Sequence, residues 1–165
     1  MKITLLTHAK EIGKRSNTGR LVLEVLGDAA EQIRWDRLTP PDGLVREIEA
    51  GGVALVYPGL PDEPHHDLRG ITRCILIDST WHEARKIHQR SPYLQRARRI
   101  SLKPAVPSRY NLRKNQKEAG LCTAECVIQL LQDVGQQAQA DRLEQLFLAH
   151  MRPLQACQTR MNNHD

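Results

Sequence analysis

The sequence predicts an α/β fold built on a mostly parallel sheet with helices on both faces. Short apolar runs alternate along the chain with longer segments in which apolar residues recur at helical spacing. Strands that alternate with helices are typical of parallel sheets, because each crossover lays a helix on one face of the sheet. The chain has 165 residues and no internal repeat or low-complexity linker, so we expect a single domain over residues 1–165.

The expected strands are the short apolar runs, at residues 2–7, 32–35, 53–57, 73–77 and 100–102. The expected helices begin near residue 17 or 18, at residue 39, at residue 80, at residue 123 and after the stop at Gly135. Thr39 before Pro40 is a strong helix start, because threonine caps a helix and proline fits its first turn. The connection at residues 103–120 is long for a compact domain, which usually indicates a functional segment.

Composition excludes several classes of protein. The mean hydropathy is −0.51, the apolar runs are far too short to cross a membrane, and no secretory signal follows Met1. We therefore expect a cytoplasmic protein with no membrane partner. The cysteines form no CxxC pair and lack zinc-finger spacing, so buried free thiols are expected at Cys74, Cys122, Cys126 and Cys157. The adjacent pair His65 and His66 is expected in a surface loop, and no metal site is predicted.

Positive charge is concentrated in one segment of the chain. Between residues 84 and 117 there are eleven lysines or arginines and no acidic residue. Of the 24 basic residues, 13 lie elsewhere against all 19 acidic ones, so the rest of the chain has a net charge of −6. This distribution indicates a polyanionic partner, and Tyr93 and Tyr110 within the segment can stack on unpaired bases. The alternative is a solvated basic face with no partner.

The segment Asp78-Ser79-Thr80-Trp81 lies where the strand expected at residues 73–77 ends and the next helix begins. In open α/β sheets, ligands bind outside the carboxyl ends of the strands, so a carboxylate and an indole at this point indicate a functional site. A second interpretation is purely structural. Thr80 and Glu83 fit a capping box at the helix start, and Asp78 can be a turn residue.

Three motifs occur together: Ser-Asn-Thr-Gly-Arg at residues 16–20, Asp-Ser-Thr-Trp at residues 78–81 and Cys-Thr-Ala-Glu at residues 122–125. Their set and order resemble the DTW-domain family, in particular its bacterial tRNA-uridine aminocarboxypropyltransferases, over residues 5–131. The resemblance implies a SPOUT-like fold with a C-terminal trefoil knot that cradles S-adenosylmethionine. It also implies transfer of the 3-amino-3-carboxypropyl group of S-adenosylmethionine to N3 of a tRNA uridine, with methylthioadenosine as the by-product.

One feature of the family is missing. Many longer relatives have an N-terminal cysteine cluster that holds zinc, and this chain begins after that point, so we expect neither that module nor zinc. A monomer is compatible with the resemblance. Three functions stay open: aminocarboxypropyl transfer to tRNA or to ribosomal RNA, SPOUT-like RNA methylation with the same co-substrate, and RNA binding without catalysis.

The implied chemistry assigns catalytic roles to the second motif. Uridine N3 is a poor nucleophile until it loses its proton, and a carboxylate held partly out of water can take that proton. Asp78 is therefore the expected general base, with Thr80 and Trp81 beside it in the catalytic set. An indole face attracts a cation by about 0.5–2 kcal/mol, so Trp81 can hold the sulfonium of S-adenosylmethionine or stack on the target base. The alternative for Trp81 is a place in the core.

The remaining residues of the expected site bind the co-substrate and the RNA. The methionyl carboxylate is expected at Ser16, Asn17 and Thr18, where a helix start offers free backbone N–H groups, although Asn17 or Thr18 can equally be a plain N-cap. The other expected co-substrate contacts lie at strand ends and at a helix start: Tyr57, Pro58, Gly59, Asp78, Ser79, Trp81, Leu121, Cys122 and Thr123. The expected RNA contacts belong to the basic segment: Lys86, Arg90, Arg99, Ser108, Arg109, Tyr110 and Arg113.

Overall fold

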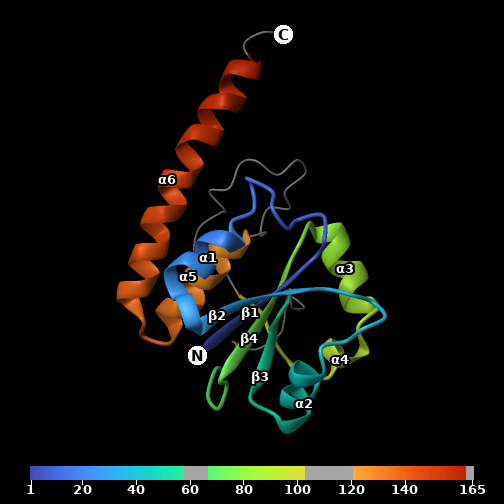
Figure 1. The fold of residues 1–165 in the computed structure, drawn as a ribbon. Coiled ribbons are helices and arrows are strands. Elements are labelled where there is room, and N and C mark those ends of the chain that lie inside the picture. The colour runs from blue at the N-terminus through green and yellow to red at the C-terminus, as the bar shows by residue number, and fades with distance from the viewer. Residues whose placement is uncertain (58–66, 103–120, 163–165) are drawn as a thin grey trace. The chain divides into compact units, whose positions relative to one another are not determined.

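The computed structural model describes residues 1–57, 67–102 and 121–162 (Figure 1). Contacts between residues divide the chain into two compact units. The first unit is Met1–Asn17 with Leu26–Leu102, and the second is Thr18–Val25 with Lys103–Asp165.

The first unit contains a five-stranded parallel sheet. Its strands are β1 (Lys2–Thr7), β2 (Ala30–Arg34), β3 (Val53–Val56), β4 (Arg73–Asp78) and β5 (Arg98–Ile100). They are ordered β2-β1-β4-β3-β5 with every neighbouring pair parallel, and Figure 1 shows β2, β1, β4 and β3 side by side. The parallel sheet confirms the predicted α/β class. All five strands therefore end at the same edge of the sheet.

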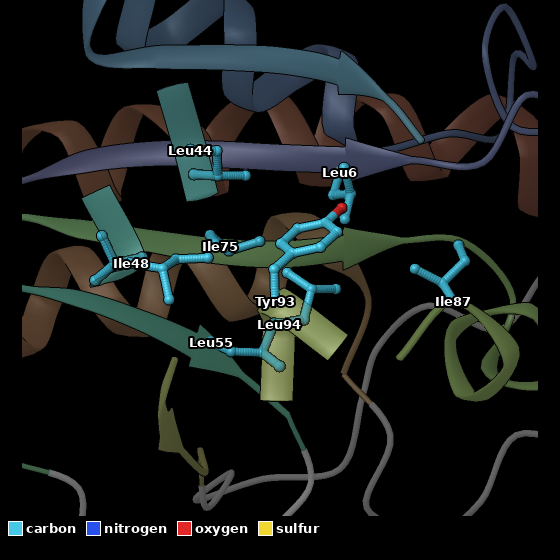
Figure 2. Packing of buried hydrophobic residues seen from close by; sticks show 9 residues of the cluster. Leu6, Leu44, Ile48, Leu55, Ile75, Ile87, Tyr93 and Leu94 are labelled. Carbon is cyan, nitrogen blue, oxygen red and sulfur yellow. The ribbon is translucent and has the colours of Figure 1, made fainter. Parts of the chain in front are cut away.

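One face of this sheet packs against helices of the same unit, which are α2 (Asp42–Ala50), α3 (Trp81–Gln89) and α4 (Pro92–Gln95). Strands and helices contribute to one cluster (Figure 2), made of Leu6, Leu44, Ile48, Val53, Leu55, Ile75, Ile87, Tyr93 and Leu94. The alternate strand residues Leu5, Ala54 and Cys74 project from the other face and are also fully buried. Burial on both faces is typical of parallel sheets.

Arg73 lies in an ion network at the amino end of the sheet. It donates from Nε to Glu47 Oε2 of α2 at 2.6 Å, from Nη1 to Thr4 Oγ1 of β1 at 2.6 Å, and from Nη1 to Glu31 Oε1 of β2. Arg73 is only 7% exposed, and a buried guanidinium needs such partners to offset its lost hydration. Hydrogen bonds from Thr4, Arg73 and Lys2 to the Glu31 carboxylate outweigh its burial, which alone would raise its pKa, and the pKa of Glu31 is lowered.

The described part of the second unit is helical. It holds most of α1 (Gly19–Leu26), together with α5 (Thr123–Asp133) and α6 (Gln137–Asn162). Leu130 and Leu131 of α5 and Leu143 and Phe147 of α6 are fully buried where these two helices pack. The turn between them is a Schellman motif: Gly135 has a φ of 78°, its N–H donates to Gln132, and the next N–H donates to Leu131. This confirms the predicted helix stop.

Three predicted boundaries are wrong by two or more residues, and one element was not predicted. The strand expected at residues 32–35 covers Ala30–Arg34. The helix expected from residue 39 begins at Asp42, because Pro41 forces the preceding residue out of the helical region and is itself extended, with a ψ of 109°. The last strand covers Arg98–Ile100, not residues 100–102, because charged side chains are tolerated on an edge strand. The short helix α4, with Pro92 at its start, was missed because four residues contain too few apolar positions to show a period. A short 3₁₀ turn, η1 (Gly27–Ala29), follows α1.

Some predictions concern residues beyond the described ranges. The trefoil knot that the resemblance implies stays a prediction. The long connection at residues 103–120 and the expected surface loop with His65 and His66 lie outside the described residues. Within the described residues, no helix is both long and apolar enough to cross a membrane.

Candidate active site

Asp78 is the last residue of β4 and lies at the carboxyl edge of the sheet. Its side chain is 3% exposed, and its Oδ2 accepts a hydrogen bond from Asn17 Nδ2 at 2.9 Å and another from Thr7 Oγ1 at 3.3 Å. Asn17 also donates to the Glu11 carbonyl at 3.2 Å, and Gln32 donates to Thr7 at 3.3 Å. The structure therefore brings together two residues from separate predicted motifs, and it holds the carboxylate in one orientation.

Strand alternation decides from which face of the sheet Asp78 projects. Asp78 pairs with Thr7 and lies three residues after Ile75, which belongs to the cluster beneath α2, α3 and α4. Its side chain consequently leaves the sheet on the face opposite that cluster. Tyr57 follows the end of β3 and packs against the cluster, so Asp78 and Tyr57 lie on opposite faces at the same edge.

Thr80 caps the helix that follows Asp78. Its side-chain oxygen accepts a hydrogen bond from the Glu83 backbone N–H at 3.3 Å, which confirms half of the predicted capping box. The Glu83 carboxylate lies instead beside His8, with 3.5 Å between Oε2 and Nε2, and beside Lys10. Thr80 is thus positioned as a helix cap, whatever else it does.

Trp81 begins α3 and is 37% exposed, so the alternative of a core tryptophan is wrong. Its ring lies 5.8 Å from that of Tyr57, centroid to centroid. Tyr57 also stacks on His88 at 4.3 Å, and the guanidinium carbon of Arg99 lies 4.8 Å from its ring centroid. Burial, and then the positive charge of Arg99, lower the pKa of the His88 imidazole.

Sequence analysis did not single out His8, and it gave Glu83 only a capping role. His8 Nδ1 accepts a hydrogen bond from the Lys10 backbone N–H at 3.1 Å, so the other ring nitrogen holds the proton that faces Glu83. The imidazole also stacks on Trp35 with 6.2 Å between ring centroids. The available signal was the position of His8 directly after β1, at the edge where Asp78 was already expected.

Thr18 and Cys122 lie in the second unit and take part in capping α5. Thr18 Oγ1 accepts from the Ala124 backbone N–H at 3.1 Å, and the Cys122 N–H donates to Glu125 Oε2 at 3.0 Å. The Cys122 carbonyl accepts from the Cys126 N–H, so both backbone groups of Cys122 serve the helix start. Burial raises the pKa of its thiol to about 12. The predicted contacts of Leu121, Cys122 and Thr123 with adenine stay predictions.

Some of the remaining predicted site residues lie in the described part of the chain and some lie outside it. Ser79 is 6% exposed and its hydroxyl donates to the Thr80 carbonyl, while Ser16 is half-buried. Lys86 and Arg90 follow Trp81 along α3 and its end. Outside the described residues lie Pro58, Gly59, Ser108, Arg109, Tyr110 and Arg113. Among the residues the structure describes, no three His, Cys, Asp or Glu side chains gather as a metal site would require.

Comparison with known proteins confirms the resemblance. Residues 1–155 match the DTW domain. The chain is similar to a Drosophila melanogaster protein named tRNA-uridine aminocarboxypropyltransferase 2, with 29% identity over 138 residues. The match covers 79% of this chain and 55% of the fly protein, so the chain spans about half the length of that curated relative. No solved structure matches the chain. Because the family match extends over nearly all of its residues, the chain belongs to the DTW-domain family.

Proposed function

We propose that this chain transfers the 3-amino-3-carboxypropyl group of S-adenosylmethionine to N3 of a uridine in tRNA. Membership of the DTW family and similarity to a protein named for tRNA-uridine aminocarboxypropyl transfer support this proposal. The structural observation behind it is the hydrogen bond between Asn17 and Asp78, since it unites two family motifs at the carboxyl edge of a parallel sheet. In this proposal both units act as one catalytic domain.

The proposed reaction forms a bond between uridine N3 and the side-chain carbon attached to sulfur, and it breaks the bond between that carbon and sulfur. The electron pair of the broken bond stays on sulfur, so the sulfonium becomes the neutral thioether of methylthioadenosine. The N3 proton has to move to a base, for which we propose the Asp78 carboxylate. Asn17 and Thr7 hold that carboxylate in place, so it does not have to reorganise as the proton arrives.

Two further roles belong to the same proposal. Ser16, Asn17 and Thr18 precede α1, and the first turn of a helix offers backbone N–H groups of the kind that a methionyl carboxylate requires. Trp81 offers an exposed ring either to the sulfonium or to the target base.

The test is incubation with an unmodified tRNA transcript and S-adenosylmethionine, followed by mass analysis of the nucleosides. We expect a uridine heavier by a 3-amino-3-carboxypropyl group, together with methylthioadenosine. A methylated nucleoside would overturn the proposal in favour of methyl transfer. Binding of tRNA without any product would indicate an RNA-binding protein.

The role of Asp78 is tested by Asp78→Asn, which keeps the shape and removes the base. A general base typically contributes about 10²–10⁴-fold, so we expect a loss of that size in product formation while calorimetry still detects S-adenosylmethionine. Asp42→Asn, at an exposed position of α2, is the matched control and should keep full activity. Near-normal turnover by Asp78→Asn would assign the base to another group.

A further inference from the structure

Four aromatic and cationic side chains gather at the carboxyl end of β3. The Tyr57 ring is stacked on the His88 imidazole with 4.3 Å between centroids and 22° between planes. The Arg99 guanidinium carbon lies 4.8 Å from the Tyr57 centroid, and the Trp81 ring lies 5.8 Å away at a tilt of 35°. These side chains come from the end of β3, from α3 and from β5, so regular elements of one unit hold them.

The helix α3 presents this group along one side. Trp81, Arg85 and His88 are spaced i, i+4 and i+7, which places them on one face of the helix. Ala84 and Ile87 are buried and form its inner face. Trp81 keeps 37% of its surface exposed although large aromatic rings are normally mostly buried, so it offers a flat apolar surface to a partner.

Three basic side chains beside this surface have no acidic partner among the described residues. Arg85, Lys86 and Arg90 form no ion pair with any residue in the described part of the chain. Other arginines of the basic segment are neutralised: Arg96 lies 3.0 Å from Glu49, and Arg98 lies 3.7 Å from Asp67. The unpaired cations thus follow α3, next to the aromatic group.

We propose that Trp81, Tyr57 and His88, with the Arg99 guanidinium, form a stacking platform for an unpaired base of the RNA substrate. Arg85, Lys86 and Arg90 hold the phosphates on either side of that base. The proposal deepens the proposed function, because it rests on RNA being the substrate. Base stacking on aromatic rings together with a row of cations is how proteins grip single strands without reading their sequence.

The charge of the platform favours RNA over S-adenosylmethionine as its occupant. The co-substrate has a positive sulfonium and no phosphate, so Arg99 and the cations of α3 repel it and attract a nucleic-acid backbone. The platform also projects from the sheet face opposite the Asp78 side chain. Of the two occupants proposed above for the Trp81 ring, we therefore assign the platform to the RNA, at the target base or a base next to it, and not to the sulfonium of the co-substrate.

A short single-stranded RNA with 2-aminopurine at one position tests the platform, because stacking quenches the fluorescence of that base. Wild-type protein should quench it, and His88→Ala should bind about 5–150-fold more weakly, the range for loss of one stacked base. Arg46→Ala changes an exposed arginine of α2, matches the charge lost in Arg85→Ala, and should leave the affinity within about twofold. Unchanged affinity of His88→Ala, or no quenching by the wild type, would overturn the platform.

Salt dependence separates the phosphate contacts from the stack. Arg85→Ala should reduce the magnitude of the slope of log affinity against log salt concentration by about 1, the amount expected for the loss of one phosphate contact. His88→Ala should leave that slope unchanged. A duplex RNA of equal length should bind the wild type and His88→Ala equally, because its bases are not free to stack. Equal losses on duplex and single strand would overturn the inference.

Calorimetry with S-adenosylmethionine alone distinguishes the two possible occupants. His88→Ala should bind the co-substrate within about twofold of wild type, and a loss of that affinity with RNA binding intact would assign the group to the co-substrate. Because these assays measure binding, a wild-type protein that binds single strands but forms no modified uridine would refute the proposed reaction and not the platform. Circular dichroism of each variant shows whether it is folded.

Discussion

Asn17 donates a hydrogen bond from its side-chain amide to the Asp78 carboxylate across 2.9 Å, although 61 residues separate the two in sequence. Asn17 also donates to the Glu11 carbonyl, so one side chain joins the segment after β1 to the end of β4. Both partners are at least 92% buried, which makes this bond worth more than a similar one in water. The pair therefore shapes the edge of the sheet before any substrate arrives.

Asn17→Ala should lower the free energy of unfolding by about 1.5–3 kcal/mol, the usual contribution of a hydrogen bond to a charged group. Asn17→Asp should lower it further at neutral pH, because two carboxylates would then face each other, and it should recover as the pH falls and one binds a proton. Urea denaturation at both pH values measures these changes. If Asn17→Ala lowers the free energy of unfolding by the same amount in an Asp78→Asn protein as in the wild type, the two side chains are not coupled.

The ion network around Arg73 predicts how stability depends on acid. The folded pKa of Glu31 lies below its ordinary value of 4.5, so its contribution is fully present above that value and is lost as the pH falls through the folded pKa. Glu31→Gln should therefore flatten the stability profile on the acid side of 4.5, while leaving the slope at higher pH unchanged. Denaturant titrations across this range measure the slope. An unchanged acid slope in Glu31→Gln would show that other carboxylates dominate.

His150 of α6 provides a separate test in the second unit. Its Nδ1 lies 2.8 Å from Arg20 Nη2 of α1, and burial, followed by the charge of Arg20, lowers its pKa below 6.5. A lowered histidine pKa contributes stability that is present above 6.5 and disappears as the pH falls through the folded value.

Arg20→Met should move the His150 pKa upward toward its ordinary value, which proton NMR of the imidazole ring measures directly. Arg142→Met removes an exposed arginine of α6 and serves as the control, with the His150 titration unchanged. If the titration midpoint of His150 is the same in Arg20→Met as in the wild type, burial alone lowers the pKa of His150.

The buried thiols predict selective chemical labelling. Burial raises the pKa of Cys74 and of Cys122 to about 12, so almost none of either thiol is ionised near neutral pH. Cys126 is less buried and should react with iodoacetamide at least tenfold faster in the native protein, as site-resolved mass spectrometry would show. In urea the three rates should converge. Rapid native labelling of Cys74 would contradict its burial in β4.

The sequence was most informative where a pattern is local. Period and turn residues predicted β1 and β4 to within one residue, because buried parallel strands are continuous apolar runs between polar turns. Asp78 and Asn17 could also be singled out as candidate site residues, since each belongs to a motif. Their mutual contact could not be predicted, because it depends on the pairing of Thr7 with Asp78 across two strands that are distant in sequence.

Residues whose role comes from tertiary stacking escaped prediction. Sequence analysis did not single out His88, because its contact with Tyr57 depends on the neighbouring end of β3. The spacing of seven residues from Trp81 was a usable signal, as it puts both on one helix face. Glu83 was predicted to complete the capping box, yet its carboxylate lies beside His8. Helix propensity alone cannot decide between these two positions of the side chain.

The three-residue strand β5 forms one border of the sheet, and two of its residues are arginines. An edge strand has backbone N–H and C=O groups with which a strand of another chain can pair, and such pairing extends the sheet. A strand of only three residues gives such a partner little length to pair with, and its long charged side chains, Arg98 and Arg99, are already engaged with Asp67 and with the Tyr57 ring. The shortness of this border strand thereby disfavours the addition of a further strand at that edge.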